Sequence, residues 1–225
     1  MVSMSSDYRS ATKRNIIMKR AYSDEAKQER EDQIIAAAES LLIEKGYHAI
    51  NMDQVARAAG LAKGTVYLYF KTKEDVFLKV FERQGGLWGD EIEQALVTIE
   101  PTHEPAQSRL IELLVHSLVS RPLFTRLVAL SPIIFEYNIP PEQLRVNKLW
   151  VYDNLRRLGD RIDEVFHLRS TGGAQLLLRL FIVVAGLEGF AHPSPIAKEI
   201  YDTEPSLPKI DFETELRTLL TLLLQ

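Results

Sequence analysis

The stretch Gly60–Phe70, GLAKGTVYLYF, decides how the N-terminal part of this chain is interpreted. It combines two glycines, one lysine and three aromatic side chains, which is unusual for an ordinary core helix. The segment before it predicts a short helix, because its apolar residues share one face: Met52, Val55, Ala56 and Ala59. Gly60 ends that helix, the next residues turn the chain, and GTVYLYF forms a second short helix.

The flanking residues predict a longer helix on each side of this pair. A helix from about Glu29 to Lys45 has a single apolar face and ends at Gly46: its apolar residues are Ile34, Ile35, Ala38, Leu41 and Leu42. Asn51 is a candidate N-cap for the first short helix, and Thr72–Asp75 reads as a capping box that starts another long helix. Two short helices joined by a glycine turn and braced by a longer helix form a helix-turn-helix.

The second helix of such a motif enters the major groove of DNA with its N-terminal residues near base edges. Gly64 leaves room for close approach to DNA, and Thr65 offers a hydroxyl for phosphate or base and a methyl for thymine. Lysines at both ends of the helix can neutralise phosphates, and the tyrosine hydroxyls suit phosphate oxygens. The residues expected to contact DNA are Asn51, Lys63, Gly64, Thr65, Tyr67, Leu68, Tyr69 and Lys73.

Some of these side chains have a simpler interpretation as core residues. For Val66 and Phe70 we expect a place in the core. For Lys63, Thr65 and Tyr67 the DNA interpretation is preferred, because the glycine turn, the spacing and the basic ends of the helix agree with one another.

The segment Gly46–Phe77, GYHAINMDQVARAAGLAKGTVYLYFKTKEDVF, resembles the DNA-binding domain of the TetR family of bacterial transcriptional regulators. The shared pattern is a glycine–aromatic pair, a polar cap, VA..AG, KGT.Y.YF and a following lysine. The resemblance implies a homodimer that binds operator DNA and carries a small-molecule inducer in its C-terminal domain. Asn51 stands where the family usually has Thr or Ser, Ala62 where Ser is usual, and Leu68 where His, Arg or Asn is frequent.

Composition is compatible with this class of protein. The 225 residues carry a net charge of −4, with 14 Lys/Arg against 12 Asp/Glu in residues 1–85 and 13 against 19 in residues 86–225. The N-terminal part, residues 1–85, is thus mildly basic and the C-terminal part is acidic, which is compatible with an N-terminal part that binds an anion such as DNA. The absence of cysteine excludes disulfides, thiolate nucleophiles and cysteine-based zinc sites. No apolar stretch reaches about 18 uninterrupted residues, so we expect a cytoplasmic protein without membrane contact.

The whole chain reads as all-α, with three parts. Residues 1–27 are polar and lack periodicity, which predicts a disordered basic arm. Residues 28–88 form the helix-turn-helix DNA-binding domain, with the motif at about 51–70. Residues 89–225 form a helical effector-binding and dimerisation domain, with helical spacing throughout and Pro-rich loops at 139–141 and 193–195.

Two segments of the C-terminal part are candidates for the dimer interface. Residues 173–190 are apolar nearly all round, and residues 212–224 carry a stripe of leucines. A helix that is apolar on every side needs cover on every side, so we expect these helices to pair with their copies in a four-helix interface. A central buried helix without dimerisation is the alternative. Gly172, Gly173, Gly186 and Gly189 would permit close approach.

Gly85–Gly86 falls inside the long helix that joins the head to the body. Two adjacent glycines weaken a helix by up to about 1 kcal/mol each relative to alanine. The sequence therefore predicts a bend at this point, with a plain helix end as the simpler alternative.

An effector site is expected among the apolar helices of the body. Pro132 breaks the helix 122–137, whose apolar side carries Ser131 and Phe135. Tyr137, Trp150 and Arg179 are candidates for the polar groups of an apolar cavity. The candidate ligand-binding residues are Ser131, Phe135, Tyr137, Trp150 and Arg179. Arg179 either binds an anionic group or pairs with an acid such as Glu188. The apolar surroundings predict a small hydrophobic effector, and the sequence indicates no cofactor and no metal.

The favoured function is a repressor that a small effector releases from a pseudo-palindromic operator. A DNA-binding regulator that ignores ligands is an alternative. A helical-bundle metalloenzyme is another, because Glu164 and His167 form an E-x-x-H pair. The chain has no second such pair, and it lacks the glycine-rich phosphate loop and the G-x-S-x-G motif.

Overall fold

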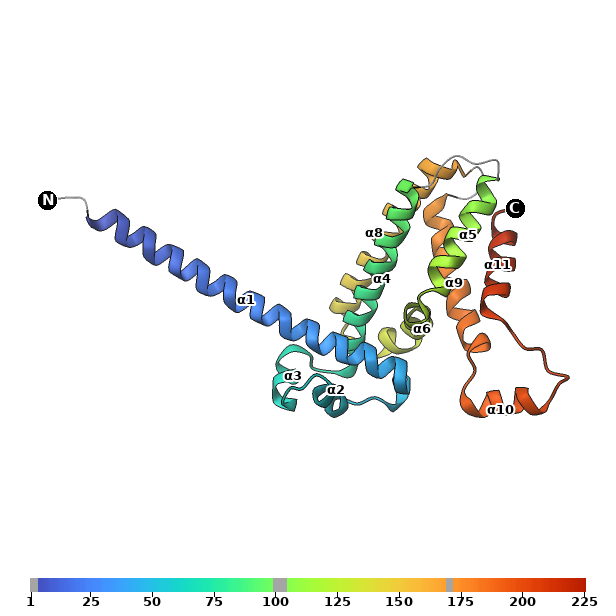
Figure 1. The fold of residues 1–225 in the computed structure, drawn as a ribbon, viewed down its shortest axis with the longest axis horizontal. Helices are drawn as coiled ribbons and strands as arrows, with labels where there is room; N and C mark the ends of the chain where they lie inside the picture. The colour runs from blue at the N-terminus through green and yellow to red at the C-terminus, as the bar shows by residue number, and fades with distance from the viewer. Residues whose placement is uncertain (1–3, 99–104, 169–171) are drawn as a thin grey trace. The chain divides into compact units, whose positions relative to one another are not determined.

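The computed structural model describes the backbone of residues 4–98, 105–168 and 172–225, and the side chains of these ranges from residue 24 onward. Every regular element in these ranges is a helix, which confirms the predicted all-α class (Figure 1). The chain divides into two compact units, Met1–Val80 and Phe81–Gln225. The division falls at Val80, whereas the sequence predicted it at residue 88, inside the same long helix.

The first unit contains α1, the short helix η1, α2, α3 and the start of α4. In Figure 1, α2 and α3 lie beside the C-terminal part of α1. Ile34, Val55, Val66 and Phe77 are fully buried and come from four different helices, so one core holds the unit together. The bounds are Met4–Lys45 for α1, Tyr47–Ala49 for η1, Met52–Ala58 for α2, Lys63–Tyr69 for α3 and Lys73–Thr98 for α4.

The disordered arm predicted for residues 1–27 differs from the structure, in which α1 runs without a break from Met4. The physical reason is composition: residues 1–45 contain neither glycine nor proline and are rich in Ala, Glu, Lys and Arg, which favour helix. Apolar periodicity, on which the prediction rested, reports packing rather than helicity. Apart from Lys27, which is exposed, the basic residues of the arm lie within residues 1–23, whose side chains are outside the described part.

The turn between α2 and α3 forms as its glycine predicts. Gly60 has a φ of 66°, in the left-handed region that glycine adopts without strain. Gly60 N donates to Arg57 O at 3.2 Å and Leu61 N donates to Ala56 O at 3.0 Å, the two hydrogen bonds of a Schellman cap. This closure fixes the direction in which α3 leaves the turn.

Both predicted N-caps are confirmed. Asn51 Oδ1 accepts from Gln54 N at 3.0 Å while Gln54 Oε1 accepts from Asn51 N at 2.9 Å, which completes a capping box. Thr72 Oγ1 accepts from Asp75 N at 3.1 Å, and Asp75 Oδ2 accepts from Thr72 N at 3.0 Å. The short helix α2 and the long helix α4 therefore each begin at a residue that the local sequence specifies, whereas α3 begins after Ala62 without a side-chain cap.

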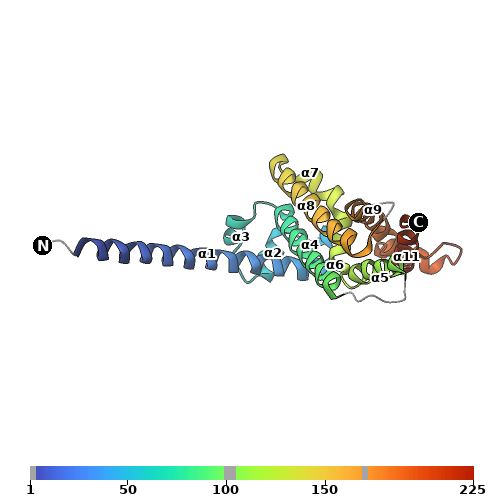
Figure 2. The ribbon, with the colours of Figure 1, turned by 90° about the horizontal axis from the view of Figure 1, so that it is seen from above.

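The second unit is a bundle built around α9. This helix packs against α6, α8 and α11, and α11 also packs against α5, as both ribbon views show (Figures 1 and 2). Trp88, Phe124 and Phe181 form its aromatic centre, with ring centroids 5.5–5.9 Å apart. The bounds are Ala106–Val119 for α5, Pro122–Leu130 for α6, Glu136–Asn138 for α7, Pro141–Phe166 for α8, Gly173–Ala191 for α9, Pro195–Thr203 for α10 and Phe212–Leu223 for α11.

The helix α4 runs through Gly85 and Gly86 as one helix, so a helix end at this point, the simpler alternative, is wrong, and the bend stays a prediction. Gly85 has a packing role. A Cβ atom at this position would lie 3.1 Å from Trp150 Cη2 and 3.4 Å from Phe124 Cε2. The missing side chain therefore makes room for two aromatic rings, whereas a Cβ at Gly86 would meet nothing within 4 Å.

Pro132 interrupts its α-helix as predicted. The α-helix ends at Leu130, and Ser131–Phe135 form the π-helical segment η2, which leads into α7. A proline cannot donate the hydrogen bond that an α-helix requires, and the wider turn accommodates that loss. Such turns are frequent at functional sites, and this one lies on a cavity described below.

Two features of the C-terminal part depart from the sequence prediction. By length and composition α9 is long and apolar enough to cross a membrane, although its contacts with three neighbouring helices also fit the core helix of a soluble protein. The helix α10 begins at Pro195, the last residue of the Pro-rich loop predicted at 193–195, and Ser194 Oγ accepts from Ala197 N at 3.3 Å. Proline at this position starts a helix rather than preventing one.

Candidate DNA-binding surface and effector cavity

The helix α3 has one buried face and one exposed face. Val66 and Phe70 are 0% and 4% exposed, which confirms that both belong to the core. Lys63, Gly64 and Leu68 are exposed, and Leu68 shows 78% of its surface. The other candidate contacts on α3, Thr65, Tyr67 and Tyr69, are half-buried. The structure therefore brings the predicted contacts together on a short surface helix whose apolar side is anchored.

Lys63 has an acidic neighbour on α2. Lys63 Nζ lies 2.7 Å from Asp53 Oδ1, and this hydrogen bond raises the pKa of Lys63. Both side chains are more than half exposed, so the pair contributes little to stability. The ammonium also lies 5.8 Å from the ring centroid of Tyr67. Asp53 therefore partly offsets the charge that Lys63 presents at the surface.

Gly64 has no internal reason to be glycine. It lies in α3, and a Cβ atom there would meet nothing within 4 Å in the protein. Glycine inside a helix costs about 0.5–1 kcal/mol relative to alanine. Because no neighbouring side chain needs the space, the bare backbone is free for close approach from outside.

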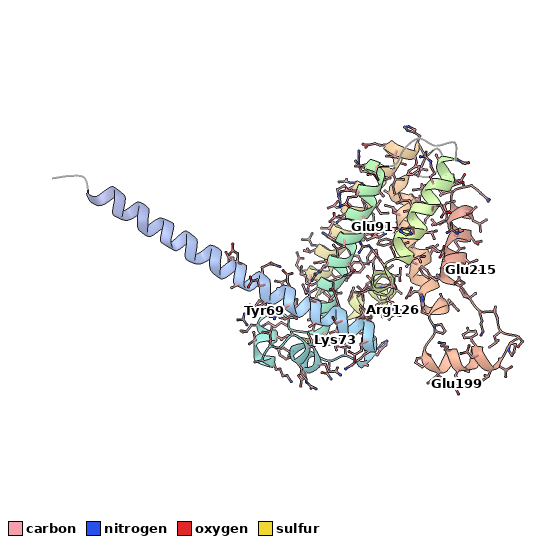
Figure 3. The ribbon with its side chains drawn as sticks, in the orientation of Figure 1. Tyr69, Lys73, Glu91, Arg126, Glu199 and Glu215 are labelled. Carbon is pink, nitrogen blue, oxygen red and sulfur yellow. The ribbon has the colours of Figure 1, made fainter. Side chains whose placement is uncertain are left out.

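A cluster of Tyr47, Lys73 and Glu74 braces the start of α4 beneath the motif. The hydroxyl of Tyr47 donates to Glu74 Oε1 at 2.7 Å, and burial together with this contact raises the pKa of Tyr47. Lys73 Nζ donates to Tyr47 O at 3.2 Å and lies 4.0 Å from the centre of its ring. Burial lowers the pKa of Lys73. Figure 3 labels Lys73, together with Tyr69 of α3.

Lys73 therefore differs from Lys63 in its surroundings. Its side chain is half-buried and one of its three donors already has an internal partner. Its expected phosphate contact has to use the remaining donors. Asn51, by contrast, is exposed and uses its carbonyl oxygen for the cap, which leaves the amide nitrogen for a second contact.

A cavity of about 170 Å³ lies between α6, α8 and α9 in the second unit. Its wall is mainly apolar, including Val128, Val151 and Phe181. A small group of polar residues shares the lining: Ser131, Asn147, Lys148 and Tyr152. An apolar wall with a few convergent polar groups is typical of a small-molecule site. A much smaller cavity of about 20 Å³ shares Phe81, Val151, Leu155 and Phe181 with it.

The sequence located part of this cavity. Ser131 lines the main cavity and Trp150 lines the smaller one. Phe135 is 1% exposed and lies outside both linings, with its ring edge-to-face against Phe81 at a centroid distance of 5.9 Å. Tyr137 is 84% exposed, and both it and Arg179 lie outside the linings of these two cavities.

The sequence did not predict three polar residues of the lining, Lys148, Tyr152 and the buried Asn147. Asn147 is 2% exposed, lines the cavity and donates through Nδ2 to Glu82 Oε1 at 3.3 Å. A signal existed, because Asn147 shares the apolar face of its helix with Val151 and Leu155 at four-residue spacing. The apolar lining residues carried no signal of their own, since a cavity wall has the same spacing as a packed core.

Glu164 and His167, the E-x-x-H pair, lie at the C-terminal end of α8. Glu164 pairs with Arg161 on the surface of α8, and His167 ends that helix in a left-handed conformation with a φ of 52°. Within the described ranges, no three His, Asp or Glu side chains gather in a way that would hold a metal ion.

Sequence comparison matches both units to one family. Residues 34–80 match the model described as bacterial regulatory proteins, tetR family, and residues 82–225 match the tetracyclin repressor-like C-terminal domain. The chain belongs to the TetR family. The second match alone covers more than half of the protein. Members of the TetR family are transcriptional regulators, and the family is not defined by an enzymatic reaction.

Curated relatives align with the N-terminal region of this TetR-family chain. The fatty acid metabolism regulator protein of Bacillus subtilis is 42% identical over 62 residues, which are 28% of this chain and 32% of the relative. The transcriptional activator FasR of Mycolicibacterium smegmatis is 36% identical over 70 residues, 31% of this chain and 32% of the relative. The chain thus spans about a third of the length of these relatives.

Solved structures extend the likeness to the whole fold. The fatty acid degradation regulator FadR of Bacillus halodurans has a TM-score of 0.55 at 22% identity and covers 87% of this chain and 94% of its own. FadR of Bacillus subtilis in complex with stearoyl-CoA has a TM-score of 0.52 at 20% identity, covering 86% and 97%. At these identities the likeness concerns the fold.

Proposed function

We propose that this TetR-family regulator is a cytoplasmic repressor that leaves its operator when a fatty acyl effector binds to the second unit. The observation that carries the proposal is the cavity between α6, α8 and α9, with its apolar wall and its few polar groups. The names of two similar proteins support the class of effector: one is a fatty acid metabolism regulator and another was solved with stearoyl-CoA.

The operator contact is assigned to the exposed face of α3. Lys63 and Tyr67 bind phosphates, and Thr65 and Leu68 reach base edges, where the leucine side chain suits a thymine methyl. Asn51, Gly64, Tyr69 and Lys73 complete the predicted set. Neutralised phosphates make such binding weaken steeply with salt, which distinguishes it from a largely apolar contact.

The homodimer is assigned to α9 and α11. Gly186 and Gly189 are exposed on α9 with nothing within 4 Å of a Cβ position, so the helix backbone is open to close approach. Ile182 on α9 is 65% exposed and Leu222 on α11 is 58% exposed. A second copy would cover these apolar groups, which explains why α9 is apolar nearly all round.

Effector binding changes the shape of the second unit in this proposal. The cavity of about 170 Å³ is smaller than the roughly 300–1,000 Å³ of typical ligand pockets. A long acyl chain therefore fits only if the lining helices move apart. The effector then favours the open arrangement by its differential affinity, and that preference is what lowers operator binding.

Val151→Trp tests this proposal by filling the cavity. Val151 is half-buried and lines both cavities, so a tryptophan occupies space that the acyl chain needs. We expect the concentration of stearoyl-CoA that releases half of the bound operator to rise roughly tenfold or more, from overpacking of about 1–3 kcal/mol. Operator affinity without effector should stay unchanged, as measured by fluorescence anisotropy.

Val165→Trp is the matched control, because Val165 is also a half-buried valine on α8 but does not line either cavity. Its release curve should overlay that of the wild type. Equal release curves for all three proteins would contradict the cavity assignment. A wild type that stays on DNA at every stearoyl-CoA concentration would favour the ligand-insensitive regulator instead.

A further inference from the structure

A second and larger cavity lies apart from the apolar one. It has a volume of about 400 Å³ and is lined by α6, the end of α9, α10 and the segment that leads to α11. This volume falls within the roughly 300–1,000 Å³ of small-molecule sites. Pro193 and Pro208 are part of its lining, and their fixed φ angles stiffen the two segments that flank α10.

The charge of this cavity is predominantly positive. Its lining contains Arg126, Lys198 and Lys209, against a single carboxylate from Asp202. Asp202 Oδ1 lies 3.1 Å from Lys209 Nζ, so this pair is internally neutralised. In the described ranges, the ammonium of Lys198 has no acidic partner. Of the three cations, Lys198 therefore keeps its full charge for a ligand, and Arg126 shares its charge with the buried Glu188.

Arg126 is only loosely held by its own acid. Glu188 on α9 is 4% exposed, and Arg126 Nε lies 3.7 Å from its Oε1, too far for a hydrogen bond. Nδ1 of His192, which also lines the cavity, lies 3.2 Å from the same oxygen, and neither oxygen of Glu188 accepts a well-formed hydrogen bond within the described part of the chain. A guanidinium has five N–H donors, and those of Arg126 remain available to a ligand.

The rest of the lining suits a ligand with a flat or apolar part. The ring of Phe190 is 66% exposed at the edge of the cavity, and Tyr201 adds a hydroxyl group. Arginine and lysine together bind a phosphate group more tightly than they bind a carboxylate group. The reason is that a phosphate carries about two negative charges and three acceptor oxygens, whereas a carboxylate carries one charge.

We propose that the cavity between α6, α9 and α10 is a phosphate-binding site, in which Arg126 and Lys198 hold the phosphate and Phe190 contacts the organic part of the ligand. This phosphate belongs to the coenzyme portion of an acyl-coenzyme effector or to a free phosphorylated metabolite. The site does not rest on the assignment of the apolar cavity, because no residue lines both.

Lys198→Gln is the variant that tests the site. Lys198 is exposed and its loss leaves no acid without a partner, so the fold is preserved. Arg156→Gln on α8 is the matched control, since it removes one exposed charge outside the lining. We expect isothermal titration with inorganic pyrophosphate and with coenzyme A to show binding that weakens about tenfold in Lys198→Gln and stays unchanged in Arg156→Gln.

Two further titrations distinguish the source of the phosphate. If the coenzyme supplies it, Lys198→Gln weakens the binding of stearoyl-CoA but not of stearate. If a free metabolite supplies it, Lys198→Gln weakens pyrophosphate binding and leaves stearoyl-CoA unaffected. A wild type that binds neither pyrophosphate nor coenzyme A, or binds them equally well after Lys198→Gln, overturns the proposal. None of these titrations contains DNA. A failure of the phosphate-binding proposal is therefore distinguishable from a failure of effector-driven operator release, which is measured with the operator duplex.

Discussion

Gly159→Ala is expected to destabilise the second unit by about 3 kcal/mol or more. Gly159 on α8 faces Gly173 on α9 where the two helices cross. A Cβ at Gly159 would lie 2.1 Å from Ala174 N and 2.5 Å from Ala174 Cα. Both atoms belong to backbone, so the helices must separate to admit the methyl group.

Urea unfolding followed by tryptophan fluorescence measures this effect, because Trp88 and Trp150 both lie in the second unit. Gly86→Ala is the matched control: it is the same change inside a helix, and a Cβ there meets nothing within 4 Å. We expect the control to stabilise the protein by about 0.5–1 kcal/mol. Equal unfolding midpoints for the two variants would show that the α8–α9 crossing is not as close as described.

Leu68→Glu is expected to weaken operator binding roughly 100-fold, through loss of a base contact and repulsion between a carboxylate and the DNA phosphates. Leu68 is 78% exposed on α3, and its removal leaves the core residues Val66 and Phe70 in place. The stability of the first unit should therefore be unaffected. Fluorescence anisotropy with a labelled operator duplex, at several salt concentrations, measures the loss.

The matched control is Ile43→Glu, which introduces the same charge at an isoleucine that is 62% exposed on α1. Because it lies outside the predicted contact set, we expect its operator affinity to remain within a few fold of the wild type. If Leu68→Glu and Ile43→Glu bind DNA alike, the exposed face of α3 is not the recognition surface.

The sequence predicted the head of the molecule well because its signals are local. Gly60 ends a helix through its own φ angle, and Asn51 and Thr72 begin helices through hydrogen bonds to residues three positions later. Val66 and Phe70 follow from spacing along one helix face. Each of these features depends on neighbours in the chain, which a sequence displays directly.

The features that the sequence did not predict depend on residues far apart in the chain. The packing role of Gly85 is one of them, because nothing nearby in the sequence reveals that Trp150 needs its space. Gly173 was expected at the dimer interface, but it contacts Gly159 within the same protomer, where a Cβ would lie 2.3 Å from Gly159 O. The sequence does not predict the lining of the apolar cavity for the same reason. A residue beside a cavity and a residue beside a packed neighbour both follow the helical spacing of an apolar face.

Selection of bound fragments from a pool of random DNA duplexes tests the central claim most directly. We expect enrichment of a pseudo-palindrome whose half-sites are centred about 34–36 Å apart, one helical turn, because two copies of α3 read the two halves. A protein that stays monomeric and enriches no duplex at low ionic strength would show that it is not a dimeric DNA-binding regulator.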